Sequence, residues 1–153
     1  MTVTMQQVLA EIDREEPDYA LLAGMGADAL PHLQGLLASS EGLKASKAAY
    51  AATLIGGAAA LPIVRSAAAH HDPQVRIAVA SGLGQMPGNV PSDLVLQALG
   101  DADVGVRKLA LRSATVLGHP DFRQRVDEIA RTDPADHLRL QAGTVLKALR
   151  TTP

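Results

Sequence analysis

Apolar residues recur along this chain at the three- and four-residue spacing typical of helices that bury one face. No stretch alternates apolar and polar residues with the β-branched side chains typical of strands. The pattern therefore predicts an all-helical protein. The expected helices lie near residues 3–15, 18–24, 28–38, 43–55, 59–70, 74–85, 92–99, 104–117, 121–131 and 135–149.

A dipeptide of a branched apolar residue and arginine lies near the start of three of these helices. Val75-Arg76, Val106-Arg107 and Leu138-Arg139 follow one another at intervals of 31 and 32 residues. A repeat of this length with two helices per unit is typical of an α-solenoid, whose units stack because none can bury its apolar face alone. We therefore expect an all-α fold, an α-solenoid of about four to five helical pairs.

The residues around these dipeptides resemble a known repeat family. Asp72-Pro-Gln-Val-Arg-Ile-Ala-Val-Ala-Ser-Gly-Leu-Gly84 and the segment 106–118 are similar to the short bacterial HEAT-like repeat, including the form named after phycobilisome lyases. The resemblance covers 18–150 and implies a single HEAT-like repeat domain over 1–153, with 1–17 as an N-terminal capping helix. The sequence departs from the pattern at Leu43-Lys44, which only approximates Val-Arg.

The aspartates in front of the repeated arginines have a structural role in this interpretation. Asp72 precedes Arg76 by four residues, and Asp103 precedes Arg107 by the same interval. This spacing predicts a local ion pair at each helix start and lets the arginine reach the loop of the next unit. With Arg139, these residues make up a predicted structural ladder. The last unit departs from the pattern, because its aspartate, Asp133, lies six residues before Arg139.

Charge is unevenly distributed along the chain. The net charge is -2, but residues 1–41 hold seven acidic residues and one basic residue, while the remainder holds 13 basic and nine acidic residues. Such blocks are typical of solvated surface, and they also permit steering of a charged partner or head-to-tail self-association through the ends. No apolar run approaches the roughly 20 residues that span a bilayer, so we expect a soluble, cytoplasmic protein.

Candidate chemistry is sparse. The chain has no cysteine, which excludes thiol nucleophiles and iron–sulfur ligation. His70 and His71 are adjacent and point about 100° apart on a helix, so they lack the spacing of a metal-binding pair. His32, His119 and His137 have no ligand-spaced neighbour. We therefore expect no catalytic residues, no metal and no cofactor, and the protein is interpreted as not being an enzyme.

The favoured function is that of a protein–protein interaction or scaffolding module. In this hypothesis the second helix of each pair lines a concave face that binds another protein. Polar residues in register with the apolar stripe of these helices are the candidate contacts: His32, Gln34, Arg65, Gln97, Arg123 and Gln124.

Two alternatives remain. Basic residues gather in two successive helices and could bind a nucleic-acid backbone, although a pI of 6.2 and 2% aromatic residues are unlike the usual basic footprint. The resemblance also allows an accessory factor to an enzyme, of the lyase-associated type. The basic residues of the first alternative are Arg107, Lys108, Arg112, Arg123, Arg125 and Arg131.

Overall fold

The computed structural model describes residues 2–150, and within this range every regular element is a helix. The α-helices are α1 (Met5–Ile12), α2 (Tyr19–Gly24), α3 (Leu30–Ser39), α4 (Gly42–Ile55), α5 (Leu61–Ala68), α6 (Pro73–Leu83), α7 (Ser92–Leu99), α8 (Val104–Leu117), α9 (Arg123–Thr132) and α10 (Asp136–Arg150). Two short 3₁₀ turns, η1 (Gly26–Ala29) and η2 (Pro120–Phe122), precede α3 and α9. The prediction of an all-helical protein is confirmed for the described residues.

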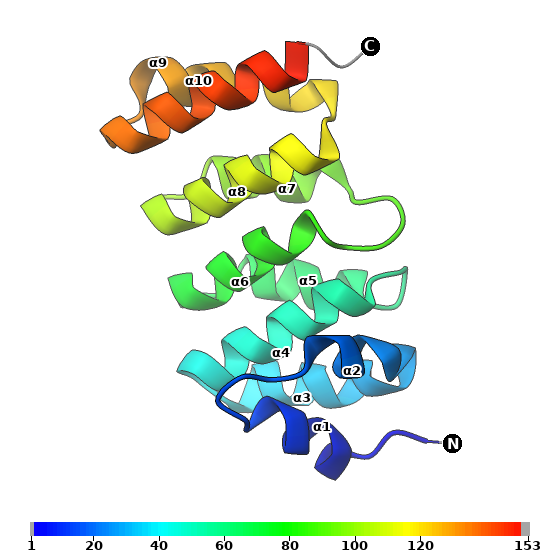
Figure 1. Ribbon diagram of the computed structural model, residues 1–153. Helices are drawn as coiled ribbons and strands as arrows, with labels where there is room; N and C mark the ends of the chain where they lie inside the picture. The colour runs from blue at the N-terminus through cyan, green and yellow to red at the C-terminus, as the bar shows by residue number, and fades with distance from the viewer. Residues whose placement is uncertain (1, 151–153) are drawn as a thin grey trace.

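The helices pack in two layers that follow the order of the chain (Figure 1). In one layer α2 packs on α4, α4 on α6, α6 on α8, and α8 on α10. Helices α3, α5, α7 and α9 form the second layer behind it, and each also packs against the first layer. Neighbours in the first layer make more extensive contacts than neighbours in the second. The two termini lie at opposite ends of the stack.

Small side chains allow the close approach within the first layer. The buried face of α4 consists largely of alanine, and Thr53 on this helix is fully buried. Gly82 on α6 faces Thr53 so closely that a Cβ atom at position 82 would overlap the threonine side chain. The alanine- and glycine-rich sequence is therefore what sets the spacing of α4 and α6, because no larger side chain fits between them.

The helix boundaries follow from local capping. Asp72 and Asp103 accept hydrogen bonds from the backbone N–H groups of Gln74 and Val106, in the first turns of α6 and α8. Gly118 ends α8 in the left-handed conformation, with φ of 65°. The observed α1 and α5 are each shorter at both ends than predicted. The two 3₁₀ turns, η1 and η2, were not predicted, because their residues were assigned to loops or to the start of the following helix.

Candidate functional site

Two ion pairs link successive inter-helix segments along one edge of the stack. The Arg76 guanidinium donates from Nε and Nη2 to the two carboxylate oxygens of Asp101, at 2.8 and 3.1 Å, and from Nη1 to the carbonyls of His70 and His71. Arg107 repeats this geometry, binding Asp133 at the same two distances and the carbonyls of Asp101 and Ala102. Each arginine therefore joins two neighbouring inter-helix segments.

The carboxylates of these pairs are held in the charged form. Burial alone would raise the pKa of Asp133, whose side chain is 3% exposed, but hydrogen bonds from Arg107 and from the Ala135 N–H lower it below the ordinary value. The pKa of Asp101 is lowered in the same way, against burial, by Arg76 and the Asp103 N–H. The pairs are therefore structural elements of the stack.

The ladder differs from its predicted form in its partners. We expected Asp72 and Asp103 to pair with the arginines four residues later, but their side chains cap α6 and α8. The arginines do reach the next inter-helix segment, as the sequence suggested, and there they bind the carboxylates of Asp101 and Asp133. The carboxylates of Asp72 and Asp103 are already engaged by backbone N–H groups at the helix starts, and each guanidinium extends across to the next inter-helix segment. In the last unit Asp133 is equivalent to Asp101, and its six-residue distance from Arg139 is the regular one. Arg139 itself hydrogen-bonds the Asp133 carbonyl and the Asp136 carboxylate.

One position of the ladder is unfilled. The buried positions of α4 match those of α6 at an offset of 31 residues, so Ala45 aligns with Arg76, and Lys44 does not, contrary to what the dipeptide Leu43-Lys44 suggested. At the same offset His70 aligns with Asp101. The His70 Nδ1 accepts from the Asp72 N–H at 3.0 Å, as Asp101 does from Asp103 at 2.9 Å. A hollow of about 650 Å³ remains between the two segments, lined by Glu41, Gly42, His70, His71, Asp72 and Pro73.

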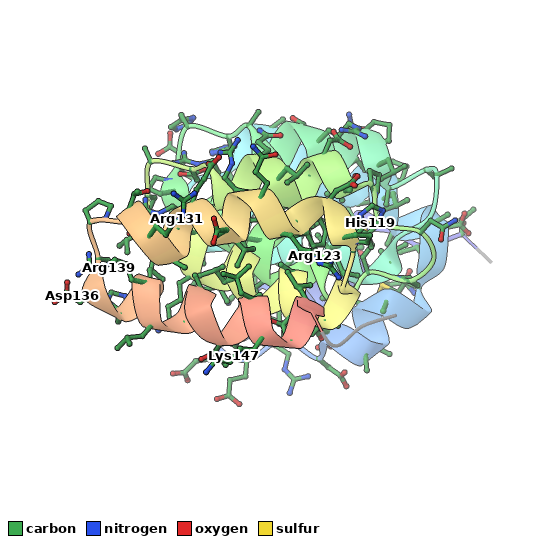
Figure 2. The ribbon with its side chains drawn as sticks, turned by 90° about the horizontal axis from the view of Figure 1, so that it is seen from above. His119, Arg123, Arg131, Asp136, Arg139 and Lys147 are labelled. Atoms are coloured by element: carbon green, nitrogen blue, oxygen red, sulfur yellow. The ribbon has the colours of Figure 1, made fainter. Side chains whose placement is uncertain are left out.

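The six residues predicted to contact a partner lie on or beside the second layer, but most are bound within the chain. His32 Nε2 lies 2.8 Å from the Val3 carbonyl. Arg65 pairs with Asp93 at 2.7 Å. Gln97 donates to the Ala68 carbonyl and Arg123 to the Leu149 carbonyl. Gln34 lines a hollow between α3 and α5, and Gln124 lines a hollow beside α7. Figure 2 shows Arg123 between α9 and α10.

A different surface is formed by the outer side of the first layer. The first layer presents one residue position repeatedly on its outer side: Tyr50 on α4, Ser81 on α6, Arg112 on α8 and Thr144 on α10, at intervals of 31, 31 and 32 residues. We call this row and the residues around it the even-helix face. The constant interval was visible in the sequence and could have identified the row, but its outward orientation depends on how the layers pack.

Two hollows meet on the even-helix face. One of about 110 Å³ lies between α6 and α8, and one of about 410 Å³ lies between α8 and α10. Arg112 and Val116 line both, so the two hollows adjoin across α8. Val116 is 69% exposed, so its apolar side chain is available to a molecule that enters either hollow. The other lining residues are mainly small or polar: Ser81, Gly84, Gln85, Leu109, Ser113, Thr115, Gln141, Thr144 and Val145.

Tyr50 is positioned on this face by two neighbours. Its hydroxyl accepts a hydrogen bond from Gln85 Nε2 at 2.9 Å, and the Tyr19 ring meets its ring edge-on at a centroid distance of 4.8 Å. Burial first, and the neighbouring Tyr50 second, raise the pKa of the Tyr19 hydroxyl above its ordinary value. Two of the three aromatic residues of the chain therefore adjoin the even-helix face.

Comparison with protein-family models and with curated protein sequences finds no match to this chain. Within residues 2–150, no group of three or more histidine and acidic side chains is placed to hold a metal ion. None of the helices in this range is both long and apolar enough to cross a membrane.

The basic residues of the nucleic-acid alternative are mostly engaged by the chain itself. Arg107, Arg125 and Arg131 pair with carboxylates, and Arg123 donates to a backbone carbonyl. Lys108 and Arg112 are exposed and form no ion pair with the described residues. The free positive charge of this region is thus concentrated on α8, on the even-helix face.

Proposed function

We propose that this chain is a non-catalytic protein interaction module, built as an α-solenoid of HEAT-like units, that binds a protein partner through its even-helix face. The observation that supports this proposal is the pair of adjoining hollows at Arg112 and Val116. Arginine is enriched among the residues that dominate binding energy at protein interfaces. The exposed apolar side chain of Val116 beside it adds apolar surface that a partner can bury.

The arginine ladder supports a scaffolding role because it makes the stack rigid. Arg76 and Arg107 each bind two successive inter-helix segments through several charge-assisted hydrogen bonds. Such contacts fix the position of one unit relative to the next. A surface held in this way loses little conformational entropy when a partner binds, which favours affinity.

The test is capture of a partner by immobilised protein from an extract of the cells that make it, with and without nuclease. Arg112→Glu combined with Val116→Asp changes the even-helix face. Arg125→Glu is the control, because Arg125 is exposed and lies on α9, in the other layer. We expect a nuclease-resistant protein to bind the wild type and the control, and to lose at least tenfold in affinity for the face variant, or about 1.4 kcal/mol.

Equal capture by both variants would contradict the choice of this face. Recovery of nucleic acid that disappears with nuclease, with affinity that falls steeply as salt rises, would instead support binding to a nucleic-acid backbone. Binding to an enzyme through the same face would support the accessory-factor alternative.

A further inference from the structure

We infer that the even-helix face binds a second copy of this chain, in an antiparallel dimer with two-fold symmetry. The inference rests on the proposed function, since it assumes that this face binds protein, and it names that protein.

The first argument is the unpaired charge at the two ends of the stack, which is acidic in the loop before α2 and basic on α8 and α10. At the N-terminal end, α2 follows a turn with the exposed acidic residues Glu15 and Glu16. At the other end α8 and α10 carry exposed Lys108, Arg112 and Lys147. None of these five forms an ion pair with another described residue. An antiparallel arrangement places each acidic end opposite a basic end, so the attraction occurs twice.

The second argument is the order of the helices. Helices α2, α4, α6, α8 and α10 follow one another along the face, with α6 in the middle (Figure 1). A two-fold axis through the centre of the face therefore places α4 of one copy opposite α8 of the other. Tyr50 then meets Arg112, and the guanidinium can lie over the aromatic ring in a cation–π contact. Tyr19 and Gln85 already hold the Tyr50 side chain in position for this contact.

The third argument is the size of the residues near the axis. Ala78 and Ser81 lie on the outer side of α6, and both are small and partly exposed. Small residues let the two α6 helices approach one another closely. At the outer ends, Leu21 on α2 is 51% exposed and Leu140 on α10 is 77% exposed. The same symmetry places α2 of one copy opposite α10 of the other. Figure 2 shows Lys147 on the side of α10 away from α9, toward this face.

The closed symmetry distinguishes this dimer from head-to-tail stacking. In a two-fold dimer each contact occurs twice and no binding surface is left over. In head-to-tail association, the ends of the stack would meet and the association would continue without limit. Only in the two-fold dimer does a residue near the axis meet the same residue of the other copy.

The experiment measures the mass of the purified protein by sedimentation equilibrium over about 1 to 200 µM, a range chosen to cover weak to moderate dimers. The monomer mass is 15.9 kDa, and we expect a concentration-dependent rise to twice this value at low salt and no further. Arg112→Glu should weaken the dimer at least tenfold, and Glu15→Lys with Glu16→Lys should do the same. Adding Lys147→Glu to the latter variant should restore part of the association. Arg125→Glu is the control and should associate like the wild type.

A cross-linking experiment tests the symmetry directly. The protein has no cysteine, so Ser81→Cys introduces a single thiol near the axis. With diamide as the oxidant, we expect a disulfide-linked dimer from Ser81→Cys and none from Ser66→Cys, which lies on the exposed side of α5 in the other layer.

Three results would overturn the dimer: a monomer at every concentration, association that continues beyond two copies, or equal cross-linking of both cysteine variants. If the protein is monomeric but the face variant loses a captured protein, the face binds a different partner and the proposed function stands. If the face variant affects neither measurement, the proposed function fails as well.

Discussion

Arg107 on α8 binds Asp133, which lies 26 residues further along the chain, through two hydrogen bonds of 2.8 and 3.1 Å. The arginine side chain is 13% exposed and the aspartate 3%. A buried ion pair of this kind is weak evidence for net stability, because both charges lose their hydration. Its energetic importance appears when one partner is removed and the other stays buried without compensation.

We therefore expect Arg107→Ala to lower the free energy of unfolding by about 3 kcal/mol, at the low end of the values measured for broken buried pairs. Urea denaturation followed by circular dichroism measures this change. Lys108→Ala is the adjacent control, because Lys108 is exposed, and it should stay within about 0.5 kcal/mol of the wild type. Similar losses in both variants would show that the pair with Asp133 is not responsible.

The same carboxylates predict how stability depends on pH. The folded-state pKa of Asp101 and Asp133 lies below the value of about 3.9 for an unfolded aspartate. The unfolded chain thus binds more protons than the folded protein as the pH falls through this range. The stabilisation is fully present above the unfolded pKa and is lost as the pH falls through the folded pKa.

The measurement is the melting temperature from neutral pH down through the acid range in which these carboxylates take up protons. The double variant Asp101→Asn, Asp133→Asn has lower stability at neutral pH, and its melting temperature should fall less steeply in acid. Parallel curves for the wild type and the variant would mean that other groups control acid unfolding.

Close packing between α4 and α6 gives a third prediction. Gly82→Ala introduces a Cβ that overlaps the buried Thr53 side chain, so the helices must separate. We expect a loss of about 1 to 3 kcal/mol, and Thr53→Ala in the same protein should recover part of it. Gly143→Ala on α10 is the control, because a Cβ there meets no atom within 4 Å, and it should stabilise the protein by about 0.4 to 1 kcal/mol. Destabilisation by both alanines would refute the packing argument.

The unfilled position of the ladder gives a fourth prediction. Ala45→Arg combined with His70→Asp supplies the two groups that the other units have, beside a hollow of about 650 Å³. We expect the double variant to be more stable than the sum of the single variants by about 0.5 to 3 kcal/mol. A complete double-mutant cycle by urea denaturation measures this coupling. A coupling of zero would mean that Ala45 and His70 are not equivalent to the ladder residues.

The hydrophobic period and the repeat were enough to predict the helices. The start and end of α7 and α8 agree with the predicted ranges, since helix formation there depends on local capping and on one apolar stripe. The sequence also placed the repeated arginines at helix starts. It could not identify the acceptor of each guanidinium, because a long side chain reaches several groups and the nearest in sequence is not the nearest in space.

The candidate site depended still more on tertiary structure. Composition and charge indicated a helical protein with acidic and basic ends, but the six predicted contact residues were selected from a helix pattern that says nothing about neighbouring helices. Arg65 and Arg123 turned out to be bound by groups 28 and 26 residues away. The even-helix face is a property of the stack, because Tyr50, Ser81, Arg112 and Thr144 share a surface only when successive units are brought into register. The local sequence thus determined which helices form, and packing between distant segments decided which side chains remain accessible to a partner.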